Sequence, residues 1–215
     1  MSEPMTAEQV ARYVVAEAIW APSVNNTQPW RFITGAPAGQ QIDLHADLER
    51  RLAVADPDGR ELMISCGAAL FNLRLALRSL GYVPEARVLP DPEDPTLVAR
   101  VTWRERAAAD EFERRLFGQV RRRRTHRGAF DPEPLPPDLL AALRAGAARD
   151  GAALRIVADD GRRAALAVAI GVQADLLTAD REPPWLGVVH RGRPHGLRHY
   201  VLGDLLCSHR LAHKA

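Results

Sequence analysis

The sequence predicts an α+β protein in which helices flank a sheet of short, antiparallel strands. Two observations predict this class. Apolar residues recur at helical spacing after Thr6 and again from Arg60 to Leu80, and short strand-like segments lie between and after these helices. Of the 215 residues, 47% are hydrophobic and 26% are charged, which is the composition of a globular protein with a sizeable core.

The first helix has clear boundaries in the sequence. Thr6 is expected to cap it, because Gln9 follows three residues later in the spacing of a capping box. Pro22 is expected to end it, since the residue before a proline is disfavoured in helical geometry. The segments 30–33 and 41–45 are then predicted to pair as strands around a glycine-rich turn.

The second helix is the strongest prediction. Asp56-Pro57-Asp58-Gly59 reads as a turn, and the apolar residues from Leu62 to Leu80 step at three and four residues. Gly81 suits the position just beyond the helix. Cys66 lies in the apolar stripe, so we interpret it as a buried, inert thiol.

The remaining chain is predicted to alternate between strands and helices. This order after about residue 118 resembles the beginning of the chain and suggests two related halves. The expected elements are strands at 86–89, 97–103 and 154–157, and helices at 109–122, up to 149 and up to 177.

Charge and composition exclude several classes of protein. The net charge of +2 gives no global field for nucleic acid, and no apolar run reaches the roughly 20 residues that span a bilayer. The first ten residues lack the basic region of a secretory signal, which predicts a cytoplasmic protein. Cys66 and Cys207 have no framework spacing, so both are expected to be reduced.

A polar loop follows the first helix and forms the first candidate site. Its sequence is Ala-Pro-Ser-Val-Asn-Asn-Thr-Gln-Pro-Trp over residues 21–30, with hydrogen-bonding side chains between two prolines. Such a loop can bind a planar, hydrogen-bonding ring. The alternative is a well-capped connection whose Asn and Ser side chains satisfy nearby backbone groups.

An arginine run, Arg121–Arg127, forms the second candidate site. Its last five residues are Arg-Arg-Thr-His-Arg, and several guanidinium groups with a hydroxyl can enclose a phosphate. Two alternatives remain open: a solvated surface at a helix end and a nucleic-acid patch, although no aromatic residues are interleaved with the arginines.

Together the two motifs resemble the nitroreductase superfamily, whose members show a P-S-x-x-N-x-Q-P-W loop and an R-x-[ST]-x-[KR]-x-F signature. The second motif here lies in mid-chain, which is similar to the Acg-type branch, where two nitroreductase-like halves are fused in one chain. The resemblance covers roughly residues 6–180. It implies a nitroreductase-like fold with a complete first half, 1–118, and a partial second half, 119–182.

The resemblance implies FMN as the cofactor. It assigns Pro22, Ser23 and Asn26 to the isoalloxazine ring, and the phosphate and ribityl chain to the residues Arg123, Arg124, Thr125 and Arg127. NADH or NADPH would be a transient electron donor, and a nitroaromatic or quinone would be the small-molecule acceptor. No catalytic side chain is expected, because the flavin carries the chemistry. His126 is interpreted as a phosphate-side or solvent-facing residue.

The C-terminal part departs from the family. Two-half members are longer, so the second half is expected to be truncated, and residues 183–215 form an atypical tail that is either disordered or read in a shifted frame. His195 with His199, and His209 with His213, have the spacing of metal ligands, but the scattered glycines disfavour a helix there and we predict no metal site. Apolar faces left uncovered by a partial half predict homodimerisation.

Three functions therefore remain at this stage. The first is an FMN-dependent NAD(P)H oxidoreductase of nitroreductase type. The second is a protein that binds or sequesters flavin without turnover, or a truncated member that has lost activity. The third is a nucleic-acid binder that uses the arginine run, which the net charge disfavours.

Overall fold

The structure is a computed structural model that describes residues 4–34, 40–126 and 133–157, with the further positions 159, 161–162, 165–166 and 168. Contacts divide the chain into a first unit that ends at Arg124 and a second unit that begins at Thr125. The tail and Arg127 lie outside the described residues, and so does most of the last predicted helix, whose positions 161, 162, 165, 166 and 168 are helical.

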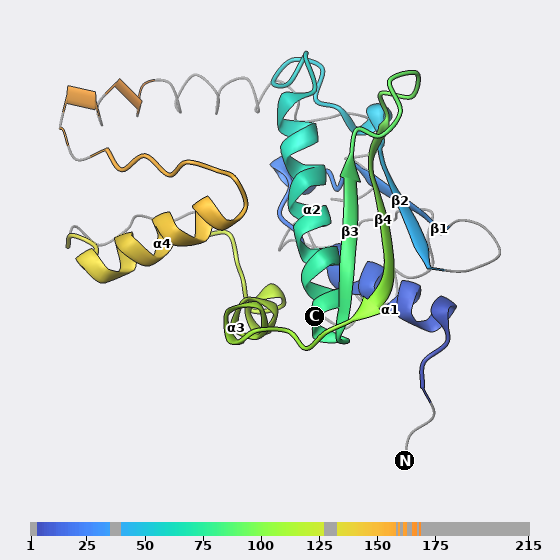
Figure 1. Cartoon of the computed structure of the whole chain (residues 1–215). Helices are drawn as coiled ribbons and strands as arrows, with labels where there is room; N and C mark the ends of the chain where they lie inside the picture. Colours follow the sequence, from blue (N-terminus) through green and yellow to red (C-terminus); the bar gives the residue numbers. More distant parts are fainter. Residues whose placement is uncertain are drawn as a thin grey trace, which may run out of the picture. The chain divides into compact units, whose positions relative to one another are not determined.

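The first unit contains a four-stranded antiparallel sheet in the order β1-β2-β4-β3 (Figure 1). Consecutive strands β1 and β2 pair in register from Trp30 opposite Ala46 to Thr34 opposite Ile42, and β4 lies between β2 and β3. The predicted α+β class with an antiparallel sheet is confirmed. The strands are β1 (Trp30–Thr34), β2 (Gln41–Ala46), β3 (Tyr82–Val88) and β4 (Leu97–Arg106).

Helices cover one face of this sheet. The long helix α2 (Arg60–Ser79) contacts all four strands, and α1 (Ala7–Ala18) and α3 (Glu111–Val120) both pack against α2 (Figure 1). Two short 3-10 helices, η1 (Val24–Asn26) and η2 (Leu48–Arg50), lie in the connections on either side of the β1–β2 pair.

The core lies between α2 and the inner face of the sheet. Alternate residues of β2 are buried, as the period of two along a strand requires, and its Ile42 and Leu44 are fully buried beside Trp30 and Trp103. Cys66 is also fully buried, which confirms its interpretation as a core residue.

The helix boundaries follow the sequence signals. The side chain of Thr6 accepts the Gln9 N–H at 3.2 Å, and the Gln9 side chain accepts the Thr6 N–H at 2.8 Å, so the capping box is formed. Gly81 has φ of 77° just after α2, a left-handed conformation that glycine adopts without cost.

Two predicted strands differ from the structure. β3 begins at Tyr82 rather than at residue 86, because the chain turns at Gly81 straight into the sheet, and Pro84 is tolerated on this edge strand where the register shifts. The predicted strand at 154–157 is wrong: these residues form neither strand nor helix. Their apolar pattern is too short to specify a strand without a neighbouring strand to pair with.

The second unit contains the helix α4 (Pro137–Arg149). Its proline at the first helical position suits a helix start, because that N–H would have no partner inside the helix. No residue of α4 is buried, and Leu139 and Leu143, which are one turn apart, are 44% and 46% exposed. The helix thus presents an apolar stripe that the described chain leaves uncovered.

Candidate flavin site

The polar loop between α1 and β1 is folded around a serine. The Oγ atom of Ser23 accepts the Gln28 N–H at 2.9 Å, and the Ser23 carbonyl accepts the Asn26 N–H at the same distance. These bonds close the loop over η1. Ser23 and Asn26 are half-buried, and Pro22 is exposed, so all three predicted ring-binding residues reach the surface of this loop.

The loop backbone is strained at three positions. Asn25, Asn26 and Gln28 have φ values of 47°, 56° and 48°, in the left-handed region that side chains other than glycine rarely adopt. Asparagine tolerates this region, but a glutamine there costs on the order of 1 kcal/mol. Such strain is concentrated at ligand-binding sites, where the surrounding structure holds an otherwise unfavourable loop.

Buried polar groups beneath the loop supply that support. Arg50, on η2, donates from Nη1 to the Thr27 carbonyl at 3.1 Å and from Nε to Asp47 at 3.2 Å. The Asp47 N–H donates to the Pro29 carbonyl at 3.0 Å. The ion pair is mostly buried, with side chains 15% and 18% exposed. The support of the loop by Arg50 and Asp47 could not be predicted from the sequence, because both residues follow the strand β2, far from the loop motif.

Cys66 is the other residue that contacts the loop from the core. Its Sγ donates to the Pro29 carbonyl at 3.1 Å, and burial, with a smaller contribution from the charge of Asp47, raises the pKa of its thiol to about 12. The thiol is therefore neutral and holds the loop without reactivity.

The donor and acceptor groups of the loop fit a flavin ring. Asn26 carries an amide that can both donate and accept, and the Ser23 hydroxyl has the same capacity. The Oε1 atom of Gln28 is buried and accepts no hydrogen bond from the described residues. A buried acceptor without a donor costs about 1–3 kcal/mol, so this part of the loop is left with unused hydrogen-bonding capacity. The chemistry suits a ligand edge that presents both acceptors and N–H groups.

The arginine run begins with an ion pair to a buried carboxylate of α1. Arg121 follows the last residue of α3, and its Nε donates to Glu17 Oε2 at 2.8 Å while its Nη2 donates to Glu17 Oε1. The carboxylate is 2% exposed and the arginine side chain 50% exposed. The same guanidinium lies over the ring of Trp20, 5.9 Å from its centre. The end of α3 is thereby fixed to the end of α1.

Of the next arginines, Arg123 reaches the residue just before the polar loop. Arg123 Nη2 donates to the Trp20 carbonyl at 3.3 Å, two residues before Pro22. Arg124 Nη1 instead donates to the carbonyls of Arg121 and Arg123, at 2.6 and 2.8 Å, and so caps the end of its own turn. The structure brings the start of the arginine run next to the start of the loop, although about a hundred residues separate them in sequence.

The charges in this run differ in environment. Partial burial lowers the pKa of the Arg123 guanidinium, and the neighbouring charge of Arg124 lowers it further, although Arg123 as a whole is exposed. The hydrogen bonds to Glu17 raise the pKa of Arg121. Arg121 is thus paired with a carboxylate, and the neighbouring positive charges of Arg123 and Arg124 would be stabilised by an anion beside them.

The remaining predicted residues lie at the end of the run. Thr125 is the first residue of the second unit, and Arg127 lies outside the described residues. His126 is exposed. In the part of the chain that the structure describes, no three His, Cys, Asp or Glu side chains gather as metal ligands. The four tail histidines of the alternative metal site lie outside that part.

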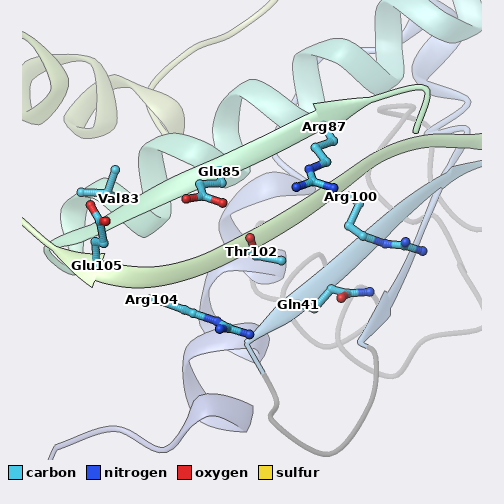
Figure 2. Close-up of a pocket in the computed structure, with 8 residues that line it drawn as sticks. All are labelled: Gln41, Val83, Glu85, Arg87, Arg100, Thr102, Arg104 and Glu105. Atoms are coloured by element: carbon cyan, nitrogen blue, oxygen red, sulfur yellow. The ribbon is translucent and has the colours of Figure 1, made fainter. Parts of the chain in front are cut away.

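A polar groove of about 400 Å³ lies elsewhere, on the face of the sheet opposite α2 (Figure 2). Arg100 is held there by Asp43 through two hydrogen bonds of 2.9 and 2.8 Å. None of the residues predicted for the flavin is among those that line it. The lining residues are Gln41, Val83, Glu85, Arg87, Arg100, Thr102, Arg104 and Glu105.

Sequence comparisons identify relatives of this chain. It is 38% identical over 149 residues to "Putative NAD(P)H nitroreductase Rv3131" of Mycobacterium tuberculosis, which covers 69% of the chain and 42% of the relative. It is 32% identical over 163 residues to "Putative NAD(P)H nitroreductase acg" of the same organism, which covers 75% of the chain and 48% of the relative. The chain belongs to the nitroreductase superfamily.

A third relative of this nitroreductase-superfamily chain has a less specific name. "Uncharacterized protein Rv3127" of Mycobacterium tuberculosis is 33% identical over 145 residues. The chain spans less than half the length of the curated relatives it matches. No protein-family model matches the chain.

Of the described helices, α2 alone is long and apolar enough to cross a membrane, and half of that stretch is buried inside this unit.

Proposed function

We propose that this chain binds FMN and acts as an NAD(P)H-dependent oxidoreductase of nitroreductase type. Bound FMN would accept a hydride from NADH or NADPH at its N5 atom and pass electrons to a nitroaromatic or quinone acceptor. The chain's residues would bind and orient the ring and the phosphate. The names of the relatives support the reaction class.

The observation that carries this proposal is the contact between Arg123 and the Trp20 carbonyl. It joins the two motifs that the family uses for one cofactor. Pro22, Ser23 and Asn26 would contact the isoalloxazine ring from the loop. The arginine run would neutralise the phosphate with charge-assisted hydrogen bonds, which are stronger than neutral ones. The residues proposed for the phosphate and ribityl chain are Arg123, Arg124, Thr125 and Arg127.

The geometry separates the arginines by role. Arg124 already donates to two carbonyls of its own turn, so it would contribute mainly charge. Arg123 makes a longer bond of 3.3 Å to a neutral carbonyl, and a phosphate oxygen is a stronger acceptor for it. We therefore propose Arg123 as the principal described residue for the phosphate.

The test is the visible absorption spectrum of the purified chain after FMN addition and desalting. Retained flavin is expected, followed by bleaching with NADH or NADPH without oxygen and reoxidation by a nitroaromatic or a quinone. Retained flavin that neither nicotinamide reduces would instead establish a flavin-binding protein without turnover. A folded chain that retains no flavin would contradict the proposal.

The domain organisation, location and assembly are part of the same proposal. We propose a first nitroreductase-like half over residues 1–118, a partial second half over 119–182 and an atypical tail from 183, in a cytoplasmic protein that recognises neither nucleic acid nor membranes. We also propose that the uncovered leucines of α4 support homodimerisation, because exposed apolar stripes favour association.

A further inference from the structure

Glu17 is the most deeply buried carboxylate among the described residues, and the flavin motifs do not include it. Its exposed fraction is 1%, and it lies on the buried side of α1, two residues before Ile19, which caps the end of this helix. A carboxylate in that position is costly unless a cation pairs with it. Arg121 is that cation, and it comes from the first residue after α3.

The geometry of this pair sets the orientation of the Arg121 guanidinium as well as pairing its charge. Both oxygens of Glu17 accept from one edge of the guanidinium, through its Nε and Nη2 atoms. A two-point contact of this kind sets the plane of the guanidinium, which a single contact to a lysine would not. Trp20 adds a second constraint, because its ring lies under the same guanidinium.

The constraint passes along the chain to Arg123. Arg123 is two residues beyond Arg121, its N–H donates to the Gln119 carbonyl at 2.8 Å, and its side chain reaches the Trp20 carbonyl. The segment from Arg121 to Arg123 is therefore held at Arg121 by Glu17 and at Arg123 by the Trp20 carbonyl. The charge of Arg121 is paired with Glu17, so Arg121 would contribute only indirectly to the binding of an anion at this site.

We infer that Glu17 is a positioning residue for the phosphate of FMN: by holding Arg121 it sets Arg123 beside the polar loop. This inference rests on the proposed function. It assigns to Glu17 a share in the preference for a phosphorylated flavin over riboflavin, although the carboxylate itself is buried and would repel a phosphate. Removing the Glu17 carboxylate should therefore weaken FMN binding if Glu17 acts by positioning Arg121, and should tighten it if Glu17 acts only through its charge.

The test compares the affinities for FMN and riboflavin, which share the ring and differ in the phosphate. In the Glu17→Gln variant, FMN binding is expected to weaken roughly tenfold, while riboflavin binding stays within about twofold of the wild type. Binding is measured by quenching of flavin fluorescence, and thermal unfolding of each variant confirms that it is folded.

Two further variants keep the test decisive. Arg121→Lys retains the charge on a half-exposed side chain but cannot make the two-point contact, so it is expected to lose the same FMN preference. The double variant Glu17→Gln with Arg121→Gln is expected to bind FMN no more weakly than either single variant, because the two residues act as one unit. Asp43→Asn is the matched control, since it breaks another two-point ion pair, on the sheet and outside the proposed site.

The outcomes separate this inference from the function on which it rests. Equal weakening of FMN and riboflavin in Glu17→Gln would mean that the pair only stabilises the fold. Tighter FMN binding would mean that the carboxylate acts only by its charge, and unchanged FMN binding would mean that it has no effect on the phosphate. Each of these results overturns the positioning role. A wild-type chain that binds neither flavin would overturn the proposed function and the inference with it.

Discussion

Three departures from ordinary backbone geometry within four residues single out the polar loop at the scale of residues. Asn25, Asn26 and Gln28 adopt positive φ angles, and the cost is offset by the Ser23 hydroxyl and by buried groups beneath the loop. The residue types at 25 and 26 indicate this conformation in advance, because asparagine favours it. The glutamine does not favour it, and its Oε1 atom is buried without a hydrogen-bond donor among the described residues.

The arginine run is expected to control flavin occupancy. In the double variant Arg123→Ala with Arg127→Ala, FMN content after desalting should fall, because each change removes a charge-assisted contact of about 1.5–3 kcal/mol. The control is Arg12→Ala with Arg115→Ala, two exposed arginines that pair with glutamates one turn away. Equal flavin content in both double variants would remove the run from the site.

Cys66 is expected to be inert in the folded chain. With the pKa of its thiol raised from 9.0 to about 12, almost no thiolate is present near neutral pH. Because the folded pKa is the higher one, the thiol's contribution to stability is full below about pH 9 and is lost as the pH rises toward 12. Alkylation at about pH 8, followed by peptide mass spectrometry, should label Cys66 only in urea. Labelling at the same rate without urea would contradict this burial.

At the scale of elements, Arg78 joins three parts of the first unit. From α2 it donates to both oxygens of Glu113 on α3, at 2.8 and 3.0 Å. It also donates to the carbonyls of Tyr82, Ala107 and Ala108, where β3 begins and where the chain leaves β4. Its side chain is 16% exposed, so these bonds are partly shielded from water. This one side chain therefore links α2 to the first turn of α3, whose start is capped by Asp110, and to the chain between β4 and α3.

Replacing Arg78 with methionine is expected to lower the free energy of unfolding by about 2–4 kcal/mol, because it leaves a partly buried carboxylate and several carbonyls without donors. Urea unfolding measures the change, with Arg60→Ala as an exposed control. The hydrogen bond from Arg78 lowers the pKa of Glu113 below 4.5, so the pair stabilises the folded state above that pH. The difference between wild type and variant should shrink as the pH falls further; a constant difference would contradict the ion pair.

At the scale of the whole molecule, the two units differ in how well they are packed. The first unit buries a core between α2 and the sheet, whereas α4 of the second buries no residue. The chain matches less than half of each of these longer relatives. The chain by itself is left with the apolar stripe of α4.

Association of the chain is expected to depend on this stripe. The double variant Leu139→Ser with Leu143→Ser should shift the mass measured by light scattering toward the monomer, because it removes exposed apolar surface. The exposed leucine Leu48, on η2, provides the control substitution Leu48→Ser. The same mass for the wild type and the double variant would show that other surfaces drive any association.

The local elements and the two motifs can be recognised from the amino-acid sequence alone. Capping residues, apolar periods and glycines are local signals, so the start of α1, the bounds of α2 and the pairing of β1 with β2 could be predicted from them. The end of α1 lies at Ala18, before the expected stop at Pro22. The start of β3 could not, since a strand extends as far as its neighbour offers hydrogen bonds. The strand expected at 154–157 was wrong for the same reason.

The contact between the polar loop and the arginine run depends on the tertiary structure. Three of the residues that hold this arrangement belong to no sequence motif: Glu17, Trp20 and Arg50. Their roles depend on hydrogen-bond partners that lie 23 to 104 residues away in sequence. A buried carboxylate is recognised by its surroundings rather than by its neighbours in the chain. The sequence thus indicates which residues suit a flavin, and the packing of α1 against the end of α3 determines that the arginine run lies beside the loop.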